Sequence, residues 1–311
     1  MDRSRLGKVT VTGRDRVAFL QGMLSNDVKA LQPGQGCPAA FLDAVGKVVS
    51  LLTVYVLEDR TLLELPAGST EKFLQAIDKF LISEKAYFEA ADDAYAILSL
   101  QGPRSGETLA RVVGSKVDLE PYAHAEMSIA GVPLRVARRS DAVTPGFHCW
   151  TAAEHAPVLM KALREAGALP VGAAAAEVLR LEAGIPVYGV DVDEGVILPE
   201  TRLDAYWSYT KGCYIGQETV ARVKYRGHIN RGLSGLVLEG ERVPSHGDLI
   251  VAVDTEVGRV TSAVLSLALG KPVALGYVRR EHFDPGSVLS VRIGDDLVYA
   301  RVAELPFVKP A

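Results

Sequence analysis

The segment Lys211-Gly212-Cys213-Tyr214-Ile215-Gly216-Gln217-Glu218 places a thiol between two glycines and close to a cation. A thiol attacks only as a thiolate, and its pKa falls near a lysine or at the N-terminus of a helix. Residues 216–221 are typical of a helix opening, with Glu218 in the first turn, where the helix dipole favours an anion. The segment therefore predicts a reactive Cys213 just ahead of a helix, with Lys211 lowering its pKa.

The same residues also allow a structural interpretation. Free cysteine is among the most buried residue types, so Cys213 could fill a turn while Lys211 is merely solvated. The chemistry of these side chains alone favours neither interpretation.

All eight residues fit a K-G-C-[FY]-x-G-Q-E run, which resembles the signature of the YgfZ family. That family comprises folate-binding relatives of the glycine-cleavage T-protein that act in iron–sulfur protein maintenance. Further segments resemble the same superfamily, so the resemblance covers most of the chain. These segments are residues 11–28, 179–186, 198–200, 258–262 and 274–278.

The resemblance implies an α+β, T-protein-like fold with three subdomains around a central folate channel. The first subdomain would be discontinuous and combine residues 1–50 with 150–232. Residues 51–149 would form a ferredoxin-like α+β subdomain, and residues 233–311 a small C-terminal β-barrel.

The function implied by the resemblance is a YgfZ-type protein that binds tetrahydrofolate and assists iron–sulfur cluster assembly or repair. Its partners would be iron–sulfur client or assembly proteins, with an indirect effect on tRNA thiolation. Cys213 and Lys211 would be the catalytic residues. The residues expected to bind the folate cofactor are Arg180, Glu182, Tyr214, Gln217 and Glu218.

Glu182 also has a physical argument for binding folate. Residues 173–183 predict a helix closed by Gly184, so Glu182 lies near the helix C-terminus, where a carboxylate is mildly unfavourable. A pterin offers N–H donors along one edge, and a carboxylate accepts two of them together. The alternative is a solvated helix face on which Arg180 pairs with Glu177.

A second function from a different class is a true aminomethyltransferase of glycine cleavage. T-proteins resemble one another in an N-x-x-x-x-x-K-D segment, whose aspartate lies near the folate methylene. The corresponding residues here are 66–73, and Phe73 stands where that aspartate would be. Without this carboxylate, the partner for a proton transfer is missing. A third possibility is a non-catalytic scaffold with a vestigial folate site.

The composition is that of an ordinary soluble protein. The chain has 311 residues and a net charge of −4, so neither nucleic acid nor a membrane is an expected partner. Three widely spaced cysteines indicate a reducing compartment, and the N-terminus lacks an apolar signal region, which predicts a cytoplasmic protein. The scattered histidines suggest no metal site, and His124, His148 and His155 are interpreted as surface or capping residues.

Patterns along the chain predict its remaining elements. Paired strands alternate with helices up to residue 183, which favours α+β layers over a doubly wound parallel sheet. From residue 233 onward six short apolar strands recur, typical of a barrel or sandwich. One face of a strand would carry Arg222, Lys224, Arg226 and His228, either as an anion-binding strip or as a solvated edge. The acidic loop at residues 191–195 is expected to be a solvated turn.

Overall fold

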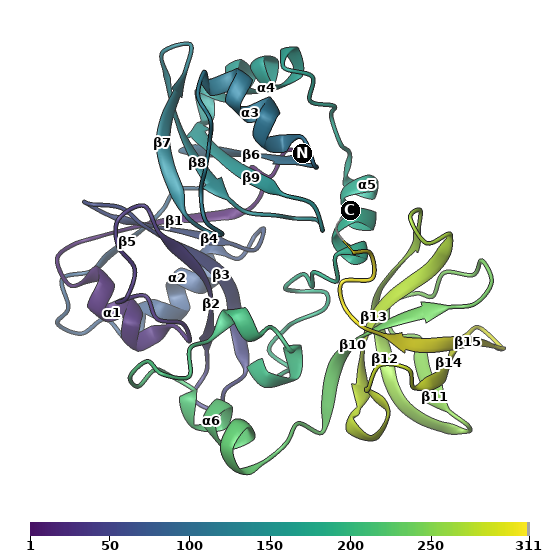
Figure 1. The fold of residues 1–311 in the computed structure, drawn as a ribbon. Helices are drawn as coiled ribbons and strands as arrows, with labels where there is room; N and C mark the ends of the chain where they lie inside the picture. Colours follow the sequence, from purple (N-terminus) through teal and green to yellow (C-terminus); the bar gives the residue numbers. More distant parts are fainter. Residues whose placement is uncertain (310–311) are drawn as a thin grey trace. The chain divides into compact units, whose positions relative to one another are not determined.

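A computed structural model describes residues 1–309 and divides the chain into two compact units (Figure 1). The first unit comprises Met1–Ser140, Thr144–Val171 and Asp204–Glu218. The second comprises Asp141–Val143, Gly172–Leu203 and the chain from Thr219 onward.

The first unit begins with a five-stranded antiparallel sheet in the order β2-β3-β4-β1-β5. Helices α1 (Arg16–Met23) and α2 (Thr70–Asp78) place Phe19, Leu20, Phe73 and Ile77 in its core. The strands are β1 (Gly7–Thr12), β2 (Gly36–Leu42), β3 (Val48–Val56), β4 (Thr61–Leu65) and β5 (Tyr87–Ala90).

A second antiparallel sheet of the same unit has the order β6-β9-β8-β7. Helices α3 (Ser105–Val113) and α4 (Ala156–Glu165) pack on one face of it through Leu109, Leu159 and Leu163 (Figure 1). The short 3-10 helix η1 (Ala153–His155) leads into α4. The strands are β6 (Tyr95–Gln101), β7 (His124–Ile129), β8 (Val132–Arg138) and β9 (Gly146–Ala152).

The two sheets of this unit meet through an apolar cluster that includes Tyr55, Leu62, Ile97 and Trp150. Two of the three histidines in this unit, His124 and His148, are buried. His124 contacts Val56 and Arg135, and the Nδ1 atom of His148 lies 3.0 Å from the carboxylate of Glu64. The prediction that His124 and His148 are surface or capping residues was therefore wrong, because their partners come from distant strands.

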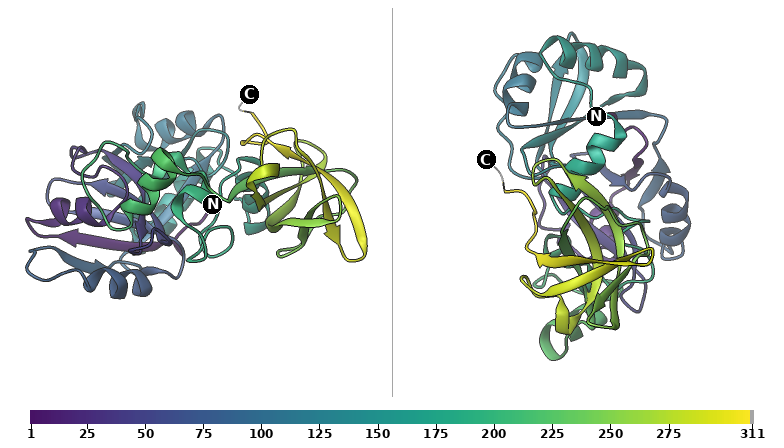
Figure 2. Two further views of the ribbon diagram at one scale, coloured as in Figure 1. Left: turned by 90° about the horizontal axis from the view of Figure 1, so that it is seen from below. Right: turned by 90° about the vertical axis from the view of Figure 1, so that its right-hand side faces the viewer.

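The second unit contains α5 (Ala173–Glu182), most of α6 (Gln217–Arg226) and a closed six-stranded antiparallel barrel (Figure 2). The barrel order is β10-β13-β12-β11-β14-β15, which leaves no free sheet edge. Its strands are β10 (Arg231–Leu238), β11 (Leu249–Ala252), β12 (Thr255–Ser266), β13 (Lys271–Arg279), β14 (Val288–Ile293) and β15 (Asp296–Ala303).

The α+β class, the α5 helix and the C-terminal barrel confirm the sequence predictions. The strand predicted at residues 222–228 was wrong, because residues 222–226 belong to α6. The predicted subdomain boundaries at residues 50 and 149 fall within β3 and β9, and the division into three subdomains stays a prediction. Among the described residues, no helix has the length and apolar character needed to cross a membrane.

The buried His124 makes stability depend on pH. Burial, and to a smaller extent the charge of Arg135, lowers the pKa of His124 from 6.5 to about 4. Arg135 donates to Nδ1 at 3.0 Å, so Nε2 carries the proton and donates to the Val56 carbonyl at 3.1 Å. The folded protein thus holds this imidazole neutral at a pH at which the unfolded chain protonates it.

We expect the stability contributed by His124 to be present above pH 6.5 and to be lost as the pH falls toward 4. Between pH 7 and pH 5 the loss should be about 2 kcal/mol. Urea unfolding at several pH values across this range should show that the free energy of unfolding changes less with pH for His124→Gln than for the wild type. The control is His155→Gln, at a partly exposed histidine, and its free energy of unfolding should change with pH as that of the wild type does. If the free energies of unfolding of His124→Gln and the wild type changed equally with pH, His124 would not be the source of the pH dependence.

Candidate functional site

The predicted site residues fall into two groups, one in each compact unit. Lys211, Cys213, Tyr214, Gln217 and Glu218 belong to the first unit. Arg180 and Glu182 belong to the second.

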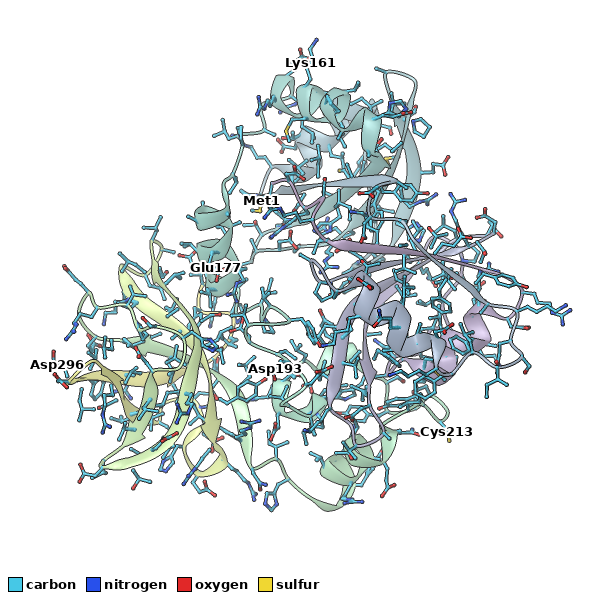
Figure 3. The ribbon with its side chains drawn as sticks, turned by 180° about the vertical axis from the view of Figure 1, so that it is seen from behind. Met1, Lys161, Glu177, Asp193, Cys213 and Asp296 are labelled. Atoms are coloured by element: carbon cyan, nitrogen blue, oxygen red, sulfur yellow. The ribbon has the colours of Figure 1, made fainter. Side chains whose placement is uncertain are left out.

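The segment around Cys213 is a tight loop that ends where α6 begins at Gln217, as predicted. Gly216 adopts a positive φ of 78°, and a Cβ there would lie 2.5 Å from the carbonyl oxygen of Asp43. Cys213 itself is exposed, and Figure 3 shows its sulfur at the surface. The thiol is therefore reachable from solvent.

Lys211 points into the protein. Its ammonium donates to the carbonyls of Gln21, Leu24 and Asn26 at 2.6, 2.5 and 3.0 Å. An ammonium has three donors, so these bonds use all of them, and a cation at the C-terminal end of α1 suits the helix dipole. The structure thus shows Lys211 anchoring the loop to α1 and does not show it directed at Cys213.

The charge of Lys211 acts on a different cysteine. Burial lowers the pKa of Lys211 to about 8, and Asp27 and Cys37 oppose that shift. Burial raises the pKa of Cys37 to about 12, although Lys211 opposes the rise. Lys211 therefore neighbours a thiol that stays protonated, a partner that the sequence spacing did not indicate.

The three cysteines should differ sharply in reactivity. Cys149 is fully buried, and burial raises its pKa to about 12, as for Cys37. Thiolates react and thiols do not. We expect iodoacetamide at pH 8 to label Cys213 at least about 100-fold faster than Cys37 or Cys149, as measured by mass spectrometry of peptides.

The matched control for this labelling is Cys213→Ser, which should remove the fast phase. Absence of fast labelling would contradict the exposure of Cys213, and fast labelling of a second thiol would contradict the protection of Cys37 and Cys149. The prediction that Cys213 is catalytic stays a prediction.

The other predicted residues of this segment have different degrees of burial. Tyr214 is buried, its pKa is raised to about 12 by that burial, and its ring lies 4.8 Å from the Lys211 ammonium. Gln217 is half-buried and Glu218 exposed at the start of α6. Tyr214 thus packs beside the Lys211 anchor, whereas Gln217 and Glu218 are open to solvent.

Arg180 is buried on α5 and uses every donor of its guanidinium. Nε and one terminal nitrogen bind Glu177, and further bonds reach Asp191 at 2.8 Å, the Ile185 carbonyl at 3.1 Å and Ser262 at 2.8 Å. A guanidinium has five N–H donors, and five bonds are made. Arg180 therefore ties α5 to β12 and has no donor left for a ligand.

Asp191 completes this network and was missed by sequence analysis. Its carboxylate accepts four hydrogen bonds, from Arg180, the Val187 amide, Thr261 and Ser262, at 2.5–2.9 Å. The prediction that residues 191–195 form a solvated turn was wrong for Asp191, which is buried, and holds for the exposed Asp193 (Figure 3). The partners of Asp191 on β12 lie about 70 residues along the chain.

Glu182 lies at the end of α5 and is only 6% exposed. Its Oε1 accepts from Ser266 Oγ at 2.7 Å and from the Ala268 amide at 3.1 Å. Within the described part of the chain, both bonds of this carboxylate fall on Oε1. The second oxygen is therefore the acceptor in this group that is available to a ligand, and the solvated-face alternative for Glu182 is excluded.

Phe73 is the residue that the sequence resemblance places at the position of the T-protein aspartate. It is 1% exposed on α2 and packs edge-on against Phe41, with ring centroids 5.8 Å apart. A side chain buried in this way is part of the core of the first sheet. It supplies neither a charge nor a proton acceptor.

Comparison with known proteins identifies one family along the chain. Residues 1–211 match the GCVT N-terminal domain, and residues 231–309 match the glycine cleavage T-protein C-terminal barrel domain. An aminomethyltransferase of Thermosynechococcus vestitus is 32% identical over 98% of this chain and 83% of its own length. An aminomethyltransferase of Streptomyces coelicolor is also 32% identical, over 99% of this chain and 86% of its own length.

A solved structure has the same fold. The crystal structure of glycine cleavage system aminomethyltransferase T from Bartonella henselae matches with a TM-score of 0.90 and 24% identity. The match covers 99% of this chain and 85% of that one. The predicted T-protein-like fold is confirmed.

These relatives correct the predicted function. The expected YgfZ-type role in iron–sulfur cluster assembly, the effect on tRNA thiolation and the iron–sulfur client partners were wrong, because the full-length relatives are aminomethyltransferases. The prediction rested on eight residues of one loop, whereas identity over the whole chain depends on every element. The alternative function, aminomethyl transfer, is the one that the relatives support.

Proposed function

The chain belongs to the glycine cleavage T-protein family, and on that basis we propose that it is a tetrahydrofolate-dependent aminomethyltransferase. The observation that carries this proposal is the 32% identity to aminomethyltransferases over nearly the whole chain. Tetrahydrofolate, when bound, accepts the one-carbon unit. The protein's own residues must hold and orient it.

Glu182 is the residue best suited to hold the cofactor. One carboxylate oxygen is fixed by Ser266 and Ala268, so the side chain is already oriented before a ligand arrives. The other oxygen can accept from the N–H edge of a pterin. Arg180 then acts as a positioning residue, because its guanidinium holds α5 against β12.

The remaining assignments are proposals of the same kind. Tyr214, Gln217 and Glu218 are proposed to bind the cofactor and Cys213 and Lys211 to take part in catalysis, with the sequence segment as their support. A lipoyl-bearing carrier protein of glycine cleavage replaces iron–sulfur clients as the proposed partner. A cytoplasmic location is proposed from the sparse cysteines.

Ammonia release tests the proposal. The protein mixed with tetrahydrofolate and an aminomethylated lipoyl carrier should release ammonia, and the release should require both components. A parallel calorimetric titration should show tetrahydrofolate binding. Tetrahydrofolate binding without any ammonia release would overturn the proposed transferase activity.

One observation favours a second candidate function. The protein would bind folate as a member of the family but would not transfer an aminomethyl group. The position of the T-protein aspartate holds a buried phenylalanine, Phe73, whose ring is fixed against Phe41. Transfer chemistry that relies on a carboxylate at this position has no group to use here. The same experiment separates the candidates, since this one predicts binding without ammonia.

A further inference from the structure

A cavity of about 240 Å³ lies within the first unit, apart from the proposed folate residues of α5. It opens where β4 and the residue before it approach strands of the second sheet. Its walls combine cations with flat and aliphatic side chains. The residues that matter are Arg60, Leu62, Tyr95, Leu134, Arg135 and Trp150.

The strand register aligns the polar part of this cavity. Glu126 on β7 is paired with Arg135 on β8, and Arg135 is paired with Trp150 on β9. Directly paired residues share one face of a sheet, so these three side chains form a row. The row lies on the face where Trp150 joins the apolar cluster with Leu62.

Two guanidiniums line this cavity, and each is paired with one carboxylate. Burial, and to a smaller extent the positive charge of Arg60, lowers the pKa of Arg135, and the charge of Glu126 opposes that shift. The acids that pair with them face solvent: the side chain of Glu126 is 69% exposed and that of Asp59 is 68% exposed. His124, which also contacts Arg135, is neutral. An anion in the cavity would relieve this repulsion.

Buried donors at the same cavity lack acceptors. Trp150 is 97% buried, with 3% of its surface exposed, and its indole N–H has no acceptor among the described residues. The Nε–H of Arg60 is likewise buried and without an acceptor in this part of the chain. Buried donors are almost always paired, so two unpaired donors on residues that line one cavity are unusual.

We propose that this cavity binds a small carboxylate with a flat, apolar body. Guanidiniums bind carboxylates through paired N–H donors, which suits Arg60 and Arg135. Tyr95 and Trp150 offer ring surfaces, and Leu62 and Leu134 offer aliphatic ones, to a planar body. The volume suits a small molecule and not a folded partner.

The test titrates benzoate into the full chain carrying Trp207→Phe, so that fluorescence reports on Trp150 alone of the two tryptophans. Saturable quenching is expected, at concentrations in the millimolar range for a ligand of about nine heavy atoms. Arg60→Gln should weaken binding at least about tenfold, as expected for the loss of a charged hydrogen bond. Benzamide, the neutral isostere, should not bind.

The controls make the outcome decisive. Arg14→Gln, at an arginine 73% exposed elsewhere in the same unit, should bind benzoate as the parent does. Thermal melting shows whether each variant is folded. Arg135→Gln is a second binding-site variant, and it should weaken benzoate binding as Arg60→Gln does. Inorganic phosphate separates carboxylate selectivity from general anion binding, and it should compete weakly. Equal binding of benzamide, equal binding by Arg60→Gln, tighter binding of phosphate, or no saturation up to about 10 mM would overturn the proposal.

Discussion

Replacing Glu182 by Gln should weaken tetrahydrofolate binding about 100-fold, equivalent to about 2.7 kcal/mol, and leave the fold intact. The amide oxygen of glutamine can still accept from Ser266 Oγ and the Ala268 amide, so the turn after β12 keeps its contacts. The amide nitrogen would replace the second carboxylate oxygen. It would present a donor to the donor edge of the pterin, and the charge that strengthens both hydrogen bonds would be gone.

Calorimetric titration of tetrahydrofolate measures this loss. The matched control is Glu165→Gln, which removes an exposed carboxylate at the end of α4 and should leave the affinity unchanged. Equal affinity of wild type and Glu182→Gln would mean that Glu182 only anchors the turn at residues 266–268. Absence of binding by the wild type itself would instead reject the proposed folate dependence.

Local patterns in the sequence were sufficient for much of the fold. The alanine-rich segment before Gly184 predicted α5, and turn residues between apolar runs predicted the six barrel strands. The same approach failed at residues 222–226, where cations two residues apart indicated a strand. Val220 and Val223 lie three residues apart in that region, and this helical spacing is the one that the structure follows.

The site was predictable only where its chemistry is local. The helix opening at Gln217 depends on adjacent residues and was predicted correctly. The partners of Lys211 lie on the last turn of α1 and just after it, 185–190 residues away, and no spacing around Cys213 reveals them. The burial of Asp191 likewise depends on Thr261 and Ser262, which only the folded barrel brings to it.

The largest effect on stability is expected at Asp191. Asp191→Ala should destabilise the second unit by about 3–5 kcal/mol, the usual cost of removing one partner of a buried ion pair. The substitution leaves the buried Arg180 guanidinium without its counterion on this side, and it removes the acceptor for the Val187 amide. Thr261 and Ser262 lose an acceptor as well, so four donors are affected together.

The measurement is hydrogen exchange of the amides in α5 and β12, because these elements are joined through Arg180, Asp191 and Ser262. Asp193→Ala is the matched control from the same loop: Asp193 is exposed, and its side chain accepts from the Gly195 amide, so the cost should stay below about 1 kcal/mol. Faster exchange in both elements for Asp191→Ala alone would support the network as the connection between α5 and the barrel. Unchanged protection would mean that apolar packing holds α5 in place, and Arg180 would then lose its positioning role for Glu182.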